Sequence, residues 1–300
     1  MTYIDTFREA EDLVTPGMSA CQGCGAEMLL RRVLKIAGSN TIIGIPPGCM
    51  AGAGVIGWDT SSGMKIPIHI PLLDNTASLL TGVTNLYQRR GRQDVNIIAF
   101  AGDGATADCG FQSLSGAAER GEKMLYICYD NEGYMNTGYQ RSSTSSLGSK
   151  TSTTPVGTVE KGKNQHQKYL PLIMMMHNVE YMATASPSNM ADFAKKIEKG
   201  LEASKRGFAY IHLFSPCPTG WGYASDMSVT IARNAVKSNT FPLVEYENGK
   251  LTLRDNKNPI TVAEFARGIK KYEHLSEEAI EELQNMVDYR MRTLQKLAEV

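Results

Sequence analysis

Two polar turns about thirty residues apart carry the residues best suited to chemistry in this sequence. Gly102-Asp-Gly104 follows the apolar segment Val95–Ala101, and Asp130-Asn-Glu-Gly133 follows the apolar segment Met124–Tyr129. If these segments are adjacent parallel strands, both turns lie at one edge of a sheet, where such sheets bind ligands. Carboxylate, amide and carbonyl oxygens suit Mg²⁺, and glycines let backbone N–H groups approach a diphosphate. The two turns therefore predict a site for a metal ion and a diphosphate.

Four cysteines form a second candidate centre. They stand in turns bounded by Gly or Pro, two in a CxxC pair and two further along: Cys21, Cys24, Cys49 and Cys217. The last two follow the apolar segments Thr41–Ile45 and Phe208–Phe214, so we expect them at the same sheet edge as the metal site. Four thiolates fit either a [4Fe–4S] cluster or a structural Zn²⁺, and the spacing leaves both open.

The elements that must position these residues alternate between strands and helices. Such alternation predicts an α/β domain over residues 1–236, with a doubly wound, mostly parallel sheet and right-handed crossovers. The expected strands are short apolar runs: Thr41–Ile45, Val95–Ala101, Met124–Tyr129, Tyr181–Ala185 and Phe208–Phe214. The expected helices lie between them: Glu27–Ala37, Thr76–Arg89, Phe111–Arg120 and Asn189–Ser204. The positive end of the helix near Phe111 is expected to face the diphosphate.

Two stretches depart from this alternation. Eleven of the seventeen residues from Ser142 to Thr158 are Ser or Thr, which is typical of a solvated loop or of a functional lid. Residues 237–300 predict a C-terminal extension. It comprises a hairpin over Phe241–Leu253, turning at Asn248-Gly249, and helices over Val262–His274 and Glu277–Val300.

The composition narrows the class of protein. The 300 residues include 31 Lys and Arg and 31 Asp and Glu, a balance that argues against nucleic acid or anionic lipid as a partner. No apolar run of about 18 residues predicts a membrane span, and the acidic start does not read as a signal peptide. With six cysteines in a chain of this length, a disulfide framework is not expected. We therefore expect a cytoplasmic protein.

The motifs, taken together and in order, resemble the beta subunit of pyruvate:ferredoxin oxidoreductase and its 2-oxoacid relatives. The resemblance rests on Cys21-x-x-Cys24-Gly25, Gly48-Cys49, Gly102-Asp-Gly104, Asp130-Asn-Glu-Gly-Tyr-Met-Asn-Thr-Gly138 and Cys217-Pro-Thr-Gly-Trp221. It implies a thiamine diphosphate-binding fold of the diphosphate type. It further implies that Asp103, Asn131 and the carbonyl of Gly133 hold Mg²⁺, and that Cys21, Cys24, Cys49 and Cys217 hold one [4Fe–4S] cluster.

The same resemblance implies the other site residues. The cofactor-binding set is Gly48, Gly102, Asp103, Gly104, Ala105, Asn131, Gly133 and Asn136. Asn136 and Thr137 are the implied catalytic residues, because they stand in the loop after the metal site. One departure is Asp130, which occupies a position where the thiamine diphosphate motif often has Asn.

The activity implied is thiamine-dependent oxidative decarboxylation of a 2-oxoacid, with pyruvate the first choice. Electrons would pass through the nearby cluster to ferredoxin, and coenzyme A would take the acyl group. The implied partners are an alpha subunit, a gamma part and a ferredoxin-like delta part. No residue here marks the carboxylate that activates the thiamine pyrimidine, so the sequence predicts half of an active site.

Other interpretations stay open at this stage. Cys109 stands where relatives usually have an apolar residue, which is either a tolerated small side chain or a change of substrate. Branched-chain 2-oxoacids and oxalate are the alternative substrates, and oxalate would need no coenzyme A. A non-redox thiamine decarboxylase or synthase with a structural zinc is the alternative from another class, and a zinc-stabilised interaction domain is a third.

Overall fold

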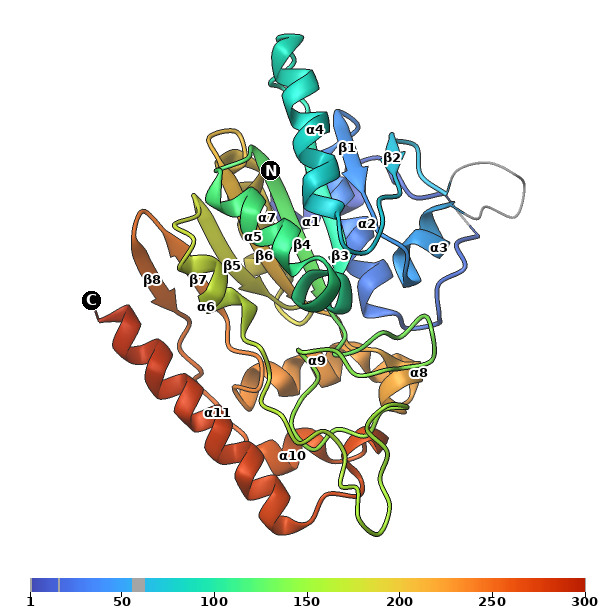
Figure 1. The fold of residues 1–300 in the computed structure, drawn as a ribbon, viewed down its shortest axis with the longest axis vertical. Helices are drawn as coiled ribbons and strands as arrows, with labels where there is room; N and C mark the ends of the chain where they lie inside the picture. The colour runs from blue at the N-terminus through green and yellow to red at the C-terminus, as the bar shows by residue number, and fades with distance from the viewer. Residues whose placement is uncertain (1, 16, 56–62, 300) are drawn as a thin grey trace.

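The computed structural model describes residues 2–15, 17–55 and 63–299, and a single sheet of eight strands organises this part of the chain (Figure 1). The strand order is β2-β1-β3-β4-β6-β5-β7-β8, parallel from β2 to β5 and antiparallel at β7 and β8. The strands are β1 (Thr41–Gly44), β2 (Ile68–His69), β3 (Asn96–Gly102), β4 (Met124–Asp130), β5 (Tyr181–Ala185), β6 (Phe208–Phe214), β7 (Val244–Glu247) and β8 (Lys250–Leu253).

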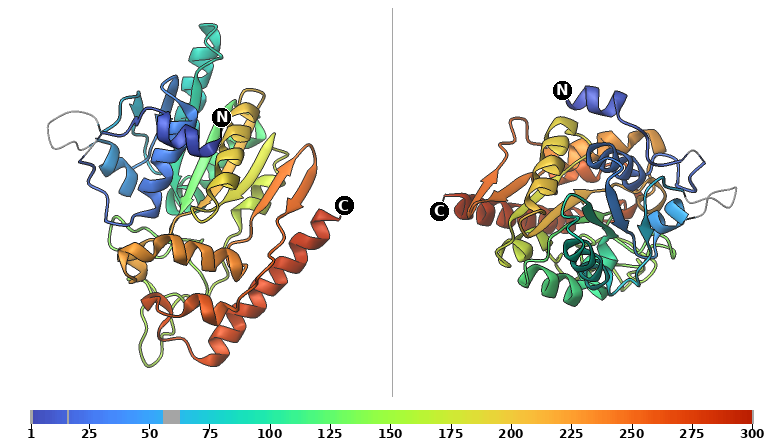
Figure 2. Two further views of the ribbon diagram at one scale, coloured as in Figure 1. Left: turned by 180° about the vertical axis from the view of Figure 1, so that it is seen from behind. Right: turned by 90° about the horizontal axis from the view of Figure 1, so that it is seen from above.

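Helices cover both faces of the sheet, as the two views of Figure 2 show. One face carries α1 (Tyr3–Glu9), α2 (Gly25–Ala37) and α7 (Met190–Ala203). The other carries α4 (Thr76–Arg89), α5 (Phe111–Glu119), α6 (Leu170–Met175) and α11 (Glu277–Ala298). This confirms the doubly wound, mostly parallel α/β fold.

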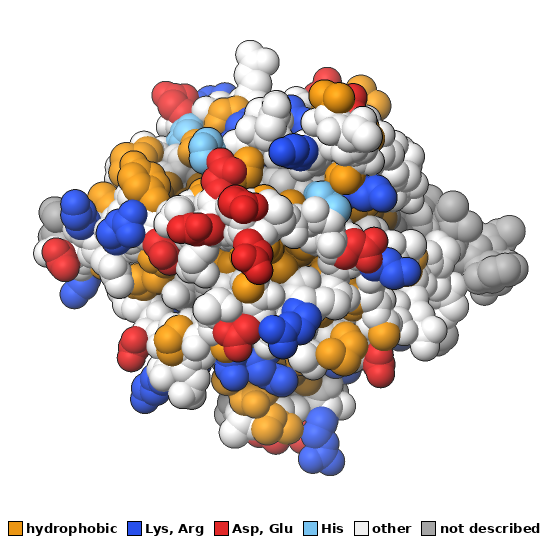
Figure 3. All heavy atoms as spheres, turned by 90° about the horizontal axis from the view of Figure 1, so that it is seen from below, with side chains coloured by type: hydrophobic (Ala, Val, Ile, Leu, Met, Phe, Trp, Pro, Cys, Tyr) orange, Lys and Arg blue, Asp and Glu red, His pale blue; other side chains and the backbone are white. Residues whose placement is uncertain are grey.

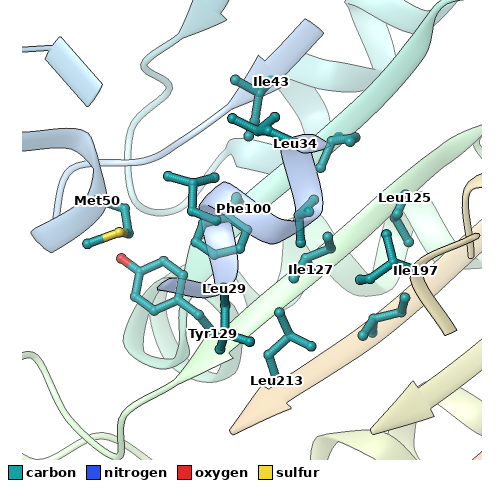
Figure 4. Close-up of a cluster of buried hydrophobic side chains, with 14 of the residues drawn as sticks. Leu29, Leu34, Ile43, Met50, Phe100, Leu125, Ile127, Tyr129, Ile197 and Leu213 are labelled. Carbon is teal, nitrogen blue, oxygen red and sulfur yellow. The ribbon is translucent and has the colours of Figure 1, made fainter. Parts of the chain in front are cut away.

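Side chains of the central strands alternate between two cores. Along β4, Leu125, Ile127 and Tyr129 face α2 and α7, whereas Met124, Tyr126 and Cys128 face α4 and α5. Figure 4 shows the first of these cores, where the ring of Tyr129 stacks on Phe100 with ring centroids 4.9 Å apart. Burial on both faces explains why the parallel strands read as continuous apolar runs.

A third cluster of buried side chains lies beyond the carboxyl ends of the strands, around the fully buried Trp221. It is built from α8 (Pro218–Trp221), α9 (Ser228–Lys237), α10 (Val262–Ala266) and the 3₁₀ turn Lys270–Tyr272, near a second such turn, Ser225–Met227. The remaining helix, α3 (Cys49–Val55), follows β1 in the chain. The face seen from below carries acidic and basic side chains interspersed, with acidic ones gathered near its middle (Figure 3).

The predicted elements and the structure differ in few places. The five predicted strands are present to within one residue at each end, and the Asn248-Gly249 hairpin turn is confirmed, with both residues at positive φ. The predicted helix Val262–His274 is wrong in its extent, because α10 ends at Ala266 and Gly268 adopts a φ of 79°. The helix predicted over Glu277–Val300 is α11, and Val300 lies outside the described residues.

Strand β2 was not predicted, because two residues carry too little periodicity to read. The proposed boundary at residue 236 stays a prediction, although β7 and β8 of the extension join the same sheet. In the described part of the chain, no helix has the length and apolar composition needed to cross a membrane.

Candidate functional site

Strand register brings the two polar turns together. Gly102 on β3 pairs with Tyr129 on β4, so Asp103, just after β3, lies beside Asp130, the last residue of β4. The neighbours of these strands are β1 and β6, which lead to Cys49 and Cys217. Four adjacent strands therefore deliver both candidate centres to one edge of the sheet.

Asp103, Asn131 and Gly133 bring polar atoms to one point. One atom of the Asn131 side-chain amide lies 2.8 Å from the carbonyl oxygen of Gly133 and 3.0 Å from Oδ1 of Asp103. If that atom is nitrogen, it donates a hydrogen bond to each; if it is oxygen, three acceptors converge. Oxygens about 2.9 Å apart form the edge of an octahedron whose metal–oxygen distance is about 2.0–2.1 Å, as for Mg²⁺. The donor set therefore fits a magnesium ion.

The electrostatics of Asp103 favour a cation there. Its side chain is fully buried, and burial together with the negative charge of Asp130 raises its pKa well above the usual range. Hydrogen bonds from Ser142, Thr144 and the backbone N–H of Asn131 act in the opposite direction. A bound cation would offset both the desolvation and the repulsion between the two carboxylates.

A hollow of about 120 Å³ opens beside this point. Its lining includes the predicted cofactor residues except Asp103, which lies buried, together with both predicted catalytic residues: Gly48, Gly102, Gly104, Ala105, Asn131, Gly133, Asn136 and Thr137. A Cβ on Gly104 would lie 2.5 Å from the ring of Tyr134, so only glycine fits there. Asn136 and Thr137 are exposed at the open side.

The element after the first turn differs from the prediction. Residues Gly104–Cys109 form a π-helical turn, in which the N–H of Gly110 donates to the carbonyl oxygen of Ala105 at 2.9 Å. The hydroxyl of Thr106 donates to the carbonyl oxygen of Gly102 at 2.8 Å and anchors this turn to β3. The expectation that the start of α5 faces the diphosphate stays a prediction, and the π-helical turn lies between β3 and α5.

The cysteine segments approach one another beyond the strand ends. The N–H of Gly25 donates to the carbonyl oxygen of Pro216 at 3.3 Å, which joins the CxxC segment to the loop of Cys217. Burial raises the pKa of Cys24 to about 11 and that of Cys49 to about 12, and the other cysteines of the set add to both shifts. Among the described residues, no three His, Cys, Asp or Glu side chains form a group that could hold a metal ion. Ligation of a cluster by these cysteines stays a prediction.

The Ser/Thr-rich stretch is not a solvated loop over its first half. In that half, five hydroxyl side chains are buried: Ser142, Thr144, Ser145, Ser146 and Ser149. Their partners include Asp103, Asp130 and Glu132, the acidic residues of the two polar turns. Sequence reasoning missed these contacts, although a run of hydroxyl residues directly after the metal loop was the available signal.

Cys109 contacts the site through an intermediary. Its sulfur lies 3.3 Å from the hydroxyl of Tyr134, which donates to the carbonyl oxygen of Gly104 at 3.1 Å. The side chain is exposed, and the described lining of the hollow includes Tyr134 but not Cys109. A role for Cys109 in substrate choice stays a prediction.

Comparison with known proteins places these features in a family. Residues 75–213 match the thiamine pyrophosphate enzyme C-terminal TPP-binding domain. The chain is 45% identical over 291 residues to the beta subunit of NADH-dependent phenylglyoxylate dehydrogenase of Aromatoleum evansii, covering 96% of this chain and 65% of that relative. This chain therefore spans just under two thirds of that relative's length.

Other relatives match over nearly their full length. The pyruvate synthase subunit PorB of Methanothermobacter thermautotrophicus is 43% identical over 93% of this chain and 96% of its own. The ketoisovalerate oxidoreductase subunit VorB of Pyrococcus furiosus is 40% identical over 95% of this chain and 93% of its own.

A solved structure shares the fold. The 2-oxoglutarate:ferredoxin oxidoreductase from Magnetococcus marinus superposes with a TM-score of 0.58 at 23% identity, over 73% of this chain and 69% of that one. With identities of 40–45% to these three relatives, the chain belongs to the beta-subunit family of the 2-oxoacid:ferredoxin oxidoreductases, and it is a thiamine pyrophosphate-domain oxidoreductase subunit.

Proposed function

We propose that this chain supplies the diphosphate half of a thiamine-dependent active site that oxidatively decarboxylates a 2-oxoacid, with pyruvate the first choice. Electrons leave through one [4Fe–4S] cluster on the chain to ferredoxin, and coenzyme A takes the acyl group. The single observation that carries this proposal is the convergence of Asn131, Asp103 and Gly133 beside a glycine-lined hollow.

Each residue of the convergence has a defined task in the proposal. Oδ1 of Asp103, Oδ1 of Asn131 and the carbonyl oxygen of Gly133 would hold Mg²⁺, which binds the cofactor's diphosphate. The backbone N–H groups of Gly104 and Ala105, two residues that line the hollow, would donate to that diphosphate. Thiamine, when bound, supplies the electron sink for loss of carbon dioxide.

The open side of the hollow would bind substrate. Asn136 and Thr137 are exposed there, and the amide of Asn136 would donate to the carboxylate or 2-oxo group of the substrate, whereas the hydroxyl of Thr137 donates to Oε1 of Gln140 and would have to turn to reach it. Gln140 holds this loop in place, because its Nε2 donates to the carbonyl oxygen of Thr137 at 2.8 Å. Asn136 and Thr137 would position the substrate rather than exchange protons with it.

The cysteines have the chemistry for a soft metal centre. Burial raises the pKa of Cys24 and of Cys49 and so disfavours their ionised thiolate form. Bound iron would stabilise that form. The backbone N–H of Gly220 lies 3.3 Å from the sulfur of Cys217, an interaction suited to a metal-bound thiolate. Structural zinc is the alternative, and it would go with a non-redox thiamine enzyme.

The lining of the hollow also favours the proposal that a partner subunit completes the active site. Among its described lining residues, none carries a carboxylate that could activate the thiamine pyrimidine. An alpha-type subunit would supply that carboxylate, and gamma and ferredoxin-like delta parts would carry electrons onward. Names of the relatives point to pyruvate, ketoisovalerate and phenylglyoxylate as 2-oxoacids handled by such assemblies. Oxalate stays an alternative substrate, because Cys109 stands where relatives usually have an apolar residue.

The test is an anaerobic assay of the chain co-expressed with its partner subunits. Pyruvate, ketoisovalerate, phenylglyoxylate and oxalate would each be offered with and without coenzyme A, and reduction of a viologen dye followed. We expect dye reduction with at least one 2-oxoacid, dependent on added thiamine diphosphate. Carbon dioxide release without dye reduction, from protein that contains zinc and no labile sulfide, would favour the non-redox alternative.

A further inference from the structure

The segment Ser142–Ser146, called here the hydroxyl strap, contacts one oxygen of the carboxylate of Asp103, the proposed metal ligand. The hydroxyl of Ser142 donates to Oδ2 of Asp103, and the hydroxyl of Thr144 lies 2.9 Å from the same oxygen. Ser142 is fully buried and Thr144 is 2% exposed. The other oxygen, Oδ1, faces Asn131. The two oxygens of Asp103 therefore lie in different surroundings.

Oδ2 is the more crowded oxygen, because Ser142 donates to it and the hydroxyl of Thr144 lies beside it whether its one proton goes to Asp103 or to Asp130. A carboxylate oxygen accepts about two hydrogen bonds, and two hydroxyls already flank Oδ2. A metal ion that reached Oδ2 would have to displace the buried hydroxyl of Ser142 or that of Thr144, and either hydroxyl would lose its hydrogen bond to a charged acceptor there. Asp103 therefore offers Oδ1 in preference to Oδ2.

The strap cannot easily swing away from this position. Thr144 also lies 2.8 Å from Oδ1 of Asp130, so its hydroxyl sits between two carboxylates whichever one receives its single proton. Asp130 is itself held by the ring of His212, whose Nε2 lies 2.9 Å from Oδ2. The hydroxyl of Ser145 donates to the carbonyl oxygen of Glu132 at 2.7 Å, which ties the strap to the second polar turn.

We propose that the hydroxyl strap makes Asp103 a one-oxygen ligand and thereby selects Mg²⁺ over Ca²⁺ at this site. Mg²⁺ takes six oxygens at about 2.0–2.1 Å, whereas Ca²⁺ takes six to eight at about 2.3–2.6 Å and gains from two-oxygen carboxylates. The oxygens of an octahedral Ca²⁺ site stand about 3.3–3.7 Å apart. With the oxygen of the Asn131 amide turned to this point, the spacings of 2.8 and 3.0 Å suit the smaller ion. This inference rests on the proposed function, because it assumes the Mg²⁺–diphosphate site.

The test measures cofactor retention rather than turnover. The full chain, in the complex with which it copurifies, is stripped with a chelator, and thiamine diphosphate binding is titrated with MgCl₂ or CaCl₂. The readout is the ratio of the half-saturating Ca²⁺ concentration to that of Mg²⁺. We expect a wild-type ratio of about ten or more, and a fall of about fivefold in Ser142→Ala and in Thr144→Val, because Oδ2 becomes free for Ca²⁺.

Matched controls separate this effect from general damage. Thr144→Ser keeps the hydroxyl and should keep the wild-type ratio. Ser149→Ala removes another buried hydroxyl of the same stretch, one that donates to the carbonyl oxygen of Ser146 at 2.7 Å, and should also keep it. If Thr144→Val does not fold, wild type and Ser142→Ala decide the question.

The outcomes distinguish the inference from the function beneath it. Equal retention of the cofactor with Ca²⁺ and Mg²⁺ in wild type, or an unchanged ratio in Ser142→Ala, would overturn the strap's role while leaving the diphosphate site intact. Cofactor uptake by wild type that needs no divalent cation at all would instead overturn the proposed function.

Discussion

The Nζ atom of Lys271 lies 2.9 Å from Oε2 of Glu132, and the lysine side chain is fully buried. Glu132 belongs to the second polar turn and has a φ of 61°, whereas Lys271 comes from the C-terminal extension. The same ammonium lies 3.3 Å from the ring centroid of Trp221, beside the loop of Cys217. The extension is thus tied to the floor of the site by one buried ion pair.

Replacing Lys271 by Met should therefore destabilise the fold. Removing one partner leaves the Glu132 carboxylate buried without its cation, which costs about 3–5 kcal/mol of unfolding free energy. The double variant Glu132→Gln/Lys271→Met should recover part of that loss, because no charge stays behind. Urea unfolding at neutral pH measures both, with Lys270→Met as the exposed control. Equal stability of Lys271→Met and wild type would show that the pair contributes nothing.

A second buried lysine predicts a pH dependence. Burial lowers the pKa of Lys163 from 10.5 to about 8, and the charge of Arg141 adds to this shift. Below pH 8 the folded chain bears the cost of a buried charge. Between about pH 8 and 10.5 the folded chain has lost this proton while the unfolded chain still binds it, so the contribution of Lys163 to stability rises with pH.

The variant Lys163→Met should lack the rise in stability with pH that Lys163 contributes. We expect the difference in unfolding free energy to move in favour of wild type by roughly 1–3 kcal/mol between pH 8 and 10. Urea unfolding at several pH values in this window measures the difference, and Lys161→Met serves as the exposed control. A difference that stays constant with pH would mean that Lys163 keeps an ordinary pKa.

The carboxylate of Asp103 should decide cofactor retention. In Asp103→Ala the only charged member of the predicted Mg²⁺ ligand set is gone, so we expect thiamine diphosphate to be lost on gel filtration while iron content stays unchanged. Asp226→Ala, at an exposed position, is the control. Full retention of the cofactor by Asp103→Ala would reduce the first polar turn to a structural role.

Cys217 should decide iron content. Cys217→Ser removes one of four predicted cluster ligands, so we expect the broad visible iron–sulfur absorbance to bleach or to fade quickly in air. Cys109→Ala removes an exposed thiol outside that set and should leave the spectrum unchanged. Stoichiometric zinc without labile sulfide in the wild-type protein would contradict the cluster assignment.

The fold was readable because its strands are buried on both faces. Segments such as Met124–Tyr129 are continuously apolar, and polar turns mark their ends, so length and position both followed from the sequence. Strand β2 was not predicted, because two residues are too few to show the alternation of apolar and polar side chains that marks a strand. The break after Ala266 depends on one glycine in a left-handed conformation, which a helical pattern hides.

The site was readable only in part. Asp103 and Asn131 could be placed together because adjacent parallel strands end at one edge. The hydroxyl strap could not, because its contacts with Asp103 span about forty residues and leave no periodicity in the sequence. The pair of Glu132 and Lys271 joins residues 139 positions apart, and neither has a local signal of burial.

The central claim is that thiamine chemistry on this chain is coupled to an iron–sulfur cluster, and one spectrum tests it directly. The complex, purified without oxygen and loaded with Mg²⁺ and thiamine diphosphate, is mixed with its 2-oxoacid in the absence of any external acceptor. The account predicts that the broad visible absorbance falls as electrons from the substrate reduce the cluster, and that Asp103→Ala shows no such fall. Decarboxylation with an unchanged spectrum in the wild-type complex would contradict it.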